Sequence, residues 1–520
     1  MKLRKKQALG NRKPVAIAGS LILLALGGTA HAQTSPQVHS DLLMDALIKK
    51  GILTQSEAQN IEAGVAVQET NVNITTAAPA FKLPSSMASM QLYGDVRLRY
   101  EYRGADNVPG ASPDTYYRER FRYALRLGIR GDLYDQFNYG IRLETSTNPR
   151  SPWATFGSNG TAGSVTPSDK SGSGINVGQL FLGWHPESWF ETTVGRMPMP
   201  LYTTPMVWDS DINPEGAFEK FKLSTSDVDL FADFGQFDYQ DPGSSSAFPS
   251  TDIFVLAWQA GGIVKFDKNT SFKIAPVLYT YTGQGYAGAG PGQSYAGAGL
   301  NTPFVGQGKN GSNTSGTPGS STYLAGYDEQ GINDLLVLEI PAEFDFPIPT
   351  TIFGNLQGRL FGDFAYNIDG NARARAAYDS AAAGAFGGLN GPAYGQDLSY
   401  QVGFGIGSAG PVYGPTQGLV YGSTSKKNTW EARFYWQHVE QYAQDVNLLD
   451  SDFFEGRGNL QGFYSSFAYS FTDAIIGTIR YGYASRIDGQ LGTGGNNLDM
   501  PSLNPINNYN IFQVDLTWRL

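Results

Sequence analysis

Apolar and charged residues alternate along residues 91–103 with a period of two, which places the two kinds on opposite faces of a β-strand. One face carries Leu92, Val96, Leu98, Tyr100 and Tyr102, and the other carries Asp95, Arg97, Arg99, Glu101 and Arg103. Residues 116–131 repeat the pattern, with Phe121, Tyr123, Leu125, Leu127 and Ile129 against Arg118, Arg120, Arg122, Arg126 and Arg130. A strand that separates lipid from a water-filled lumen requires this alternation. The pattern therefore predicts a transmembrane β-barrel with a charged interior.

Sixteen segments have strand character, and a single-chain bacterial barrel has an even number of strands. They are 91–103, 116–131, 136–146, 174–184, 189–197, 216–224, 227–237, 252–266, 270–282, 332–346, 351–368, 397–407, 428–440, 459–470, 474–486 and 508–520. Their connections alternate between short turns, such as 132–135, and long Gly- and Ser-rich loops, such as 283–331 and 369–396. This alternation is typical of an outer-membrane barrel. Residues 408–427 depart from it, because they are too long for a turn on the short-turn side.

Composition favours the same fold. The chain has 64 Gly, 29 Tyr and 30 Phe, which suit turns, polar loops and aromatic girdles. A soluble secreted β-sandwich is the alternative, but its strands would be about 5–6 residues long, shorter than the segments above. The chain has no Cys, so no disulfide is expected, and its net charge of −10 argues against nucleic acid as a partner.

Residues 1–32 have the pattern of a secretory signal peptide. Basic residues come first, an apolar run from Val15 to Leu26 follows, and Ala30-His31-Ala32 forms a small-residue cleavage site. A single membrane anchor is the alternative, but the run is too short to span comfortably. No later segment approaches 18 consecutive apolar residues, so no spanning helix is expected after residue 32.

Residues 33–90 are predicted to form a periplasmic helical segment and a linker. Residues 41–50 have a helical pattern that ends at Gly51, and Thr54 begins a capping box that opens a second short helix through Ile61. The segment could be a simple appendage, a trimer-forming element or a contact with the cell wall. The predicted fold is thus an all-β, 16-stranded antiparallel barrel over residues 91–520, preceded by this segment.

The chain resembles the putative porin family of Gram-negative outer membranes. The resemblance rests on the order of several short motifs: 42–54, 93–100, 120–123, 195–198, 208–211 and 450–453. It implies a 16-stranded, trimeric pore and does not identify a solute. The last strand, which runs to the final Leu520, also resembles the C-terminal insertion signal of such barrels, although the usual last residue is Phe.

The parity of each strand predicts which side chains line the pore. On the first three strands the expected lining residues are Asp95, Arg97, Arg99, Glu101, Arg118, Arg120, Arg122, Arg126 and Arg142. Later strands add Asp229, Asp233 and Arg359, and place Glu339, Glu343 and Asp345 on the same inner face. Charges of opposite sign are therefore expected on opposite walls, where they would sort ions within a Debye length of about 8 Å. The plainer alternative is that any wet interior must be polar.

The third outer loop, residues 198–215, is expected to fold into the bore and narrow it. Its candidate constriction residues are Asp209, Asp211 and Glu215. Asp209, Asp211 and Asn213 also have the opening spacing of a calcium loop. However, Pro214 replaces the required Gly and Lys220 the bidentate Glu, so no metal site is predicted.

An outer-membrane enzyme is the main alternative class. After residue 32 the chain has only three histidines, at positions 39, 185 and 438, and it contains no G-x-S-x-G elbow and no H-E-x-x-H motif. We therefore expect no catalytic residues and no cofactor. His438 shares the lipid-side parity of Trp436, which favours an aromatic-girdle role.

The sequence thus predicts an outer-membrane porin, exported by a cleaved signal peptide, that passes small hydrophilic solutes and ions by passive diffusion. Its expected partners are outer-membrane lipid, those solutes and further copies in a homotrimer. Two alternatives remain: a solute-specific anion channel for phosphate or organic acids, and a structural or adhesive barrel without transport.

Overall fold

A computed structural model describes residues 84–107, 115–146, 150–157, 174–240, 253–282, 335–350, 355–374, 394–408, 426–489, 491–493 and 506–520. Contacts divide the chain into Met1–Lys82 and Leu83–Leu520, and the description below concerns the second unit. The predicted signal peptide, both predicted helices and most of the long connection 408–427 lie outside the described residues. None of the helical residues described forms a helix long and apolar enough to cross a membrane.

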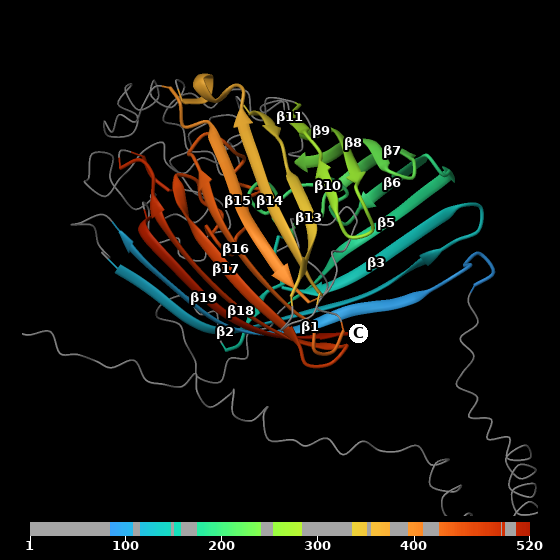
Figure 1. Ribbon diagram of the computed structural model, residues 1–520, viewed down its shortest axis with the longest axis horizontal. Coiled ribbons are helices and arrows are strands. Elements are labelled where there is room, and N and C mark those ends of the chain that lie inside the picture. The colour runs from blue at the N-terminus through green and yellow to red at the C-terminus, as the bar shows by residue number, and fades with distance from the viewer. Residues whose placement is uncertain are drawn as a thin grey trace, which may run out of the picture. The chain divides into compact units, whose positions relative to one another are not determined.

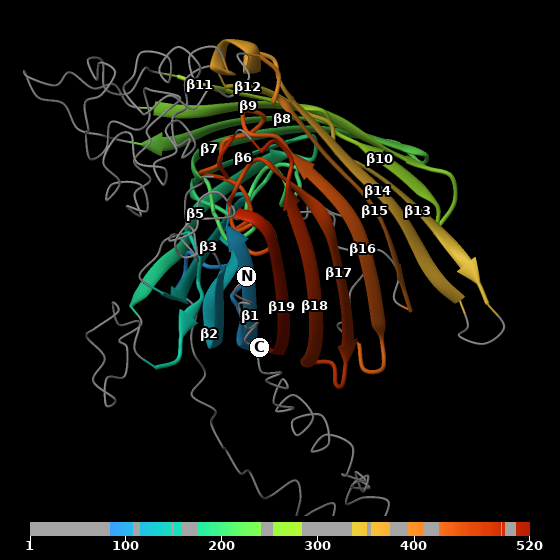
Figure 2. The same ribbon diagram turned by 90° about the vertical axis from the view of Figure 1, so that its left-hand side faces the viewer.

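The second unit is built from one antiparallel sheet (Figure 1). Its strands are β1 (Gln91–Asn107), β2 (Thr115–Asp132), β3 (Phe137–Thr145), β4 (Ala154–Thr155), β5 (Ile175–Glu187), β6 (Phe190–Arg196), β7 (Glu215–Ser224), β8 (Val228–Gln240), β9 (Ile253–Lys265), β10 (Ser271–Ile274), β11 (Val277–Tyr281), β12 (Leu336–Glu339), β13 (Ala342–Pro349), β14 (Asn355–Asn367), β15 (Leu398–Gly407), β16 (Trp430–Val439), β17 (Leu460–Ser470), β18 (Ile475–Arg486) and β19 (Ile506–Arg519). Because β1 pairs with both β2 and β19, the sheet closes into a barrel, and Figure 2 shows this seam from the side.

Sixteen strands cross the barrel wall, as the sequence predicted. The two-residue β4 is a loop segment that pairs with β2. β10 and β11 both pair with β9 and are the halves of one interrupted strand, and β12 and β13 both pair with β14 in the same way. Pro276 lies between the first two halves and Pro341 between the second two. Proline cannot donate a ladder hydrogen bond, which explains both interruptions.

The alternation of the sequence matches the two faces of the wall. On β2, Phe121 and Leu125 are 56% and 40% exposed, whereas Arg122 and Arg126 between and beside them are 7% and 8% exposed. The outward face is apolar and the inward face is charged, as lipid outside and polar groups inside require. His438 lies on the outward face of β16 and stacks on Tyr400 of β15.

Short turns lie at one end of the barrel, where the chain also enters it. The turn between β2 and β3 holds the residues before β1: Ala88 N–H donates to Asp132 O (2.9 Å) and Tyr134 N–H donates to Ser86 O (3.4 Å). The loops that follow β6 and β16 leave from the opposite end of the wall.

Candidate functional site

Two loops fold into the barrel interior and meet there. They are residues 197–214, after β6, and residues 440–459, after β16. Their apolar side chains are almost fully buried together with inward residues of the wall; they include Met197, Leu201, Tyr202, Trp208, Tyr442, Val446, Phe453 and Phe454. The sequence anticipated the first inward loop but not the second.

Backbone contacts join the two loops. Asp209 N–H donates to Leu448 O (2.6 Å), and Asp450 N–H donates to Pro205 O (3.2 Å). The Asp209 carboxylate accepts Ser451 N–H (3.1 Å) and, through its other oxygen, Asp211 N–H (2.9 Å). Asp209 is only 2% exposed, so its role in this structure is to connect the loops rather than to present a free charge.

The loop 197–214 is attached to the wall formed by β9 to β14. Thr203 Oγ1 donates to Glu339 on β12 (2.8 Å), and Thr204 Oγ1 donates to Asp363 on β14. The Lys273 ammonium of β10 lies 3.5 Å from the centre of the Tyr202 ring. Glu339, which the sequence placed on the inner face, and Asp363 are therefore both hydrogen-bonded to the loop.

Opposite this attachment lies a group that we call the arginine cluster: Arg97, Arg99, Arg103, Arg120, Arg122 and Arg126 of β1 and β2. Glu101, which is fully buried, lies among four of them. Its oxygens are 3.0 Å from Arg103 Nε, 2.5 Å from Arg120 Nη2, 3.5 Å from Arg122 Nη1 and 3.7 Å from Arg99 Nη1. One carboxylate thus lies within 4 Å of four guanidinium groups of the wall.

Both inward loops present a carboxylate to the arginine cluster. Asp211 of the first loop lies 3.6 Å from Arg126 Nη1, and Asp452 of the second lies 3.0 Å from Arg99 Nη1. Asp452 also accepts from Arg103 Nη2 (3.4 Å). The interior thus narrows between acidic loop residues and a basic wall.

Three of the charged residues at this narrowing were absent from the sequence-based set. Asp515 of β19 accepts Arg99 Nε (2.7 Å) and also pairs with Arg480 of β18, while Asp452 comes from the unexpected loop. The alternation of residues 508–520 already placed the neighbours of Asp515 toward lipid, so parity could have identified it. Asp452 lies in the motif at residues 450–453, but nothing in that motif indicated that its loop folds into the barrel.

The remaining predicted site residues lie in three settings. Arg118 and Arg142 share the inward face of β2 and β3, and Arg142 pairs with Glu144 (2.9 Å). On the other wall, Asp229 pairs with Lys265 (2.6 Å) and Asp233 with Lys220 (3.8 Å). Arg359 pairs there with Asp345 (2.6 Å) and Glu343 (3.0 Å), so both signs occur on that wall.

Glu215 does not join the constriction, which corrects the expectation for this residue. It is the first residue of β7 and pairs with Arg196 of β6 (2.5 Å). Arg196 has the parity of Val194, which is 50% exposed on the outer surface, and the Glu215 side chain is 52% exposed. The strand begins one residue earlier than the loop prediction assumed, and this turns Glu215 outward.

The loop carboxyl groups differ in their ease of ionisation. Burial and the nearby carboxylates of Asp450 and Asp211 raise the pKa of Asp209 well above its usual range. Burial and Asp452 raise the pKa of Asp450 to about 7. Burial opposes ionisation of Asp452 as well, but Arg99 and Arg103 outweigh it and lower its pKa. Of these three carboxyl groups, Asp452 is therefore the one that ionises most readily.

The charged side chains that remain accessible at the narrowing are few. Side-chain exposure is 31% for Arg97, 28% for Asp452, 22% for Arg480 and 16% for Asp211, against 2% for Arg99. A solute passing through the interior would meet these groups, whereas the buried ion pairs behind them hold the wall together.

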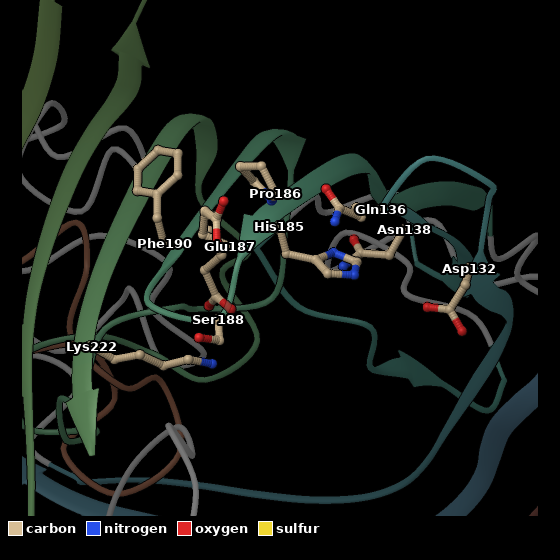
Figure 3. A pocket seen from close by; sticks show the side chains of 10 residues that line it. Asp132, Gln136, Asn138, His185, Pro186, Glu187, Ser188, Phe190 and Lys222 are labelled. Carbon is tan, nitrogen blue, oxygen red and sulfur yellow. The ribbon is translucent and has the colours of Figure 1, made fainter. Parts of the chain in front are cut away.

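A separate polar cavity of about 600 Å³ lies at the short-turn end (Figure 3). Its lining includes Asn138, His185, Glu191 and Lys222, which come from β3, β5, β6 and β7. His185, one of the three histidines after residue 32, belongs to the end of β5.

Two solved structures illustrate what this chain is similar to. The fold is similar to an anion-selective porin from Comamonas acidovorans, at 10% identity and a TM-score of 0.39, over 83% of this chain and 99% of that chain. A triple mutant of the Rhodopseudomonas blastica porin is similar at 11% identity and a TM-score of 0.35, over 83% of this chain and 100% of that chain. At such TM-scores the architecture rests on the strand pairings themselves. No curated protein matches the chain.

A family model gives the more specific result. The model of the family described as putative porin matches residues 105–286, from the end of β1 past β11. Over that range the chain carries the signature of the putative porin family, which confirms the resemblance expected from its sequence motifs.

Proposed function

We propose that this protein is an outer-membrane porin that passes small hydrophilic solutes and ions by passive diffusion. The observation that carries the proposal is the narrowing of a closed barrel between the arginine cluster and the carboxylates Asp211 and Asp452. Sixteen-stranded barrels leave an aqueous channel, and inward loops set its narrowest point. No step in this function requires a catalytic group or a cofactor.

We further propose that the channel favours anions. The arginine cluster and Arg480 are faced by Asp95, Glu101, Asp211, Asp452 and Asp515, so among the residues that the structure describes cationic groups outnumber these carboxylates at the narrowing. Asp209 and Asp450 carry less than their full negative charge at neutral pH, because their pKa values are raised. At an effective dielectric constant near 20, two unit charges 4 Å apart interact by roughly 4 kcal/mol, enough to sort ions.

A solute-specific anion channel is the second candidate. Arg97 and Arg480 are both partly accessible, and guanidinium groups bind phosphate and carboxylate in a bidentate manner. Such a site would make the flux of phosphate or a dicarboxylate saturate with concentration, whereas simple diffusion would not saturate.

The cellular setting completes the proposal. The signal peptide of residues 1–32 would be removed on export, residues 33–90 would lie in the periplasm, and the barrel would assemble as a homotrimer in the outer membrane. The outward apolar face of the wall suits lipid as its surroundings.

Planar-bilayer recording tests the function. The purified barrel should give stable conductance steps, and its reversal potential in a KCl gradient should show preference for chloride over potassium. Saturation by phosphate or a dicarboxylate would favour the second candidate. Absence of conductance from a folded barrel would contradict both and support a structural or adhesive role.

A further inference from the structure

The outward face of β6, β7 and β8 carries polar and charged groups where the wall should be apolar. Arg196 pairs there with Glu215 (2.5 Å), and Gln236 Nε2 donates to Glu219 (3.0 Å). Exposed apolar residues on the same face of each strand show that this face points outward. Val194 on β6, Leu223 on β7 and Leu230 on β8 are 50%, 65% and 50% exposed.

Glu219 borders a hollow on this face. The hollow has a volume of about 410 Å³ and is lined by Glu219, Phe221, Phe234, Gly235, Gln236, Leu256 and Trp258. Its walls are aromatic and its edge is polar. Aromatic side chains with a few polar groups are characteristic of protein–protein contacts. Lipid chains offer no partner for the hydrogen-bonding groups that Glu219 and Gln236 do not use on each other.

The wall is also low at this point. β6 has 7 residues, whereas its neighbours β5 and β7 have 13 and 10. A tilted strand needs about 9–11 residues to cross the hydrocarbon core. β6 is therefore too short to cross the hydrocarbon core by itself. Arg196 is the last residue of β6 and Glu215 is the first of β7, so both lie at this end of the wall.

We propose that the outward face of β6 to β9, defined by Arg196, Glu215, Glu219, Gln236 and Trp258, is the contact surface for a second copy of this chain. The proposal rests on the proposed function in one respect, that the barrel lies in a membrane. It goes beyond the expected trimer because it assigns the contact to one sector of the wall.

A second copy fits better than lipid or an unrelated partner. The face presents one cation and two carboxylates, so an identical copy supplies groups of both signs. Copies of one barrel sit at the same depth in the bilayer, which brings their polar outward residues to the same level without further adjustment. Most soluble oligomers are built from identical chains, and in a two-fold contact the same surface of each chain must be complementary to itself.

Site-specific photo-crosslinking in the native outer membrane tests the contact. A photoreactive amino acid would replace Trp258, on the proposed face, or Val402 of β15 as the matched control. Val402 is also outward and is 58% exposed, but its register partners on the neighbouring strands are the apolar Gly362 and Trp436. We expect a crosslinked band at twice the mass of the single chain, containing only this chain, from position 258 and not from position 402.

Crosslinks to lipid alone at position 258, or to a different protein, would overturn the proposal. So would equal dimer bands from both positions. A second variant, Glu219→Leu combined with Gln236→Leu, supplies an independent measurement. If the face met lipid, these apolar residues would leave the oligomer unchanged and stabilise the barrel. We expect instead that the oligomer band on unheated gels is lost while the single barrel stays folded.

Conductance separates this inference from the proposed function. The Glu219→Leu, Gln236→Leu variant should still conduct, because both side chains lie outside the lumen. Loss of the oligomer with retained conductance supports the contact surface, and an intact oligomer without conductance would contradict the channel function alone.

Discussion

Arg99 and Asp515 form a two-pronged ion pair, with Nε 2.7 Å from Oδ1 and Nη2 3.0 Å from Oδ2, although 416 positions separate them. They are also register partners across the β1–β19 seam that closes the barrel. Both side chains are 2% exposed, so water screens the pair poorly. The closing seam is thus held by an inward ion pair in addition to the backbone ladder.

Replacing Asp515 with Ala should weaken the barrel substantially. The change leaves Arg99 and Arg480 without this carboxylate, and removal of one partner of a buried pair costs roughly 3–5 kcal/mol. We expect a loss of stability at the lower end of this range, because Arg99 keeps its ion pair with Asp452. The free energy of unfolding in urea, measured in lipid bilayers, provides the test.

Asp229→Ala is the control for that experiment. Its partner Lys265 is 40% exposed, and exposed pairs contribute about 0–1 kcal/mol. Similar losses from both variants would show that the seam pair has no special role in stability.

Leu125→Arg should harm the barrel far more than Arg126→Leu, although the two positions are adjacent. Leu125 faces outward and is 40% exposed, whereas Arg126 faces Asp95 and Asp211 inside. A cation on the lipid face of a barrel costs about 2–4 kcal/mol at mid-membrane, while lumen changes mainly tune selectivity. The folded fraction on unheated gels measures the difference, and equal losses would mean that the faces are assigned wrongly.

Asp452→Asn should shift the reversal potential toward anions more than Asp209→Asn does. Asp452 is partly accessible and its pKa is lowered, so it carries charge at the narrowing, whereas Asp209 is 2% exposed with a raised pKa. Reversal potentials in a KCl gradient provide the comparison.

Arg97→Ala is the opposite-sign control and should shift selectivity toward cations, because Arg97 is 31% exposed. A larger shift from Asp209→Asn than from Asp452→Asn would contradict the assignment of Asp452 to the accessible narrowing.

The contact between the two inward loops should loosen as the pH rises. The pKa of Asp450 is raised to about 7, against about 3.9 for an ordinary aspartate. A carboxyl group with a raised pKa in the docked state favours docking at low pH, and that contribution is lost as the pH rises from about 4 through 7. Hydrogen exchange of residues 440–459, measured at pH 5 and pH 8, should be faster at pH 8 after correction for intrinsic rates.

Asp450→Asn should remove most of this dependence, because the amide does not titrate. A pH dependence that is unchanged in Asp450→Asn would assign the effect to another group, with Asp209 as the first candidate since its pKa is also raised.

The sequence alone determined the wall of this barrel. The alternation from Leu92 to Arg103 and along 116–131 identified the strands, and it placed Leu125 outward and Arg126 inward. This is possible because successive side chains of a β-strand point to opposite faces, so the pattern is local in sequence. The same signal yielded sixteen crossing strands, and the interruptions at Pro276 and Pro341 did not change that number.

Only the tertiary structure decided how the interior is filled. Asp452 reaches Arg99 from a loop 353 positions away, Asp209 connects two loops instead of facing solvent, and Glu215 turns outward to Arg196. Loops have no fixed period, so their side-chain directions follow from contacts between distant parts of the chain. Those contacts exist only once the β1–β19 seam has closed and brought the arginine cluster opposite the loops.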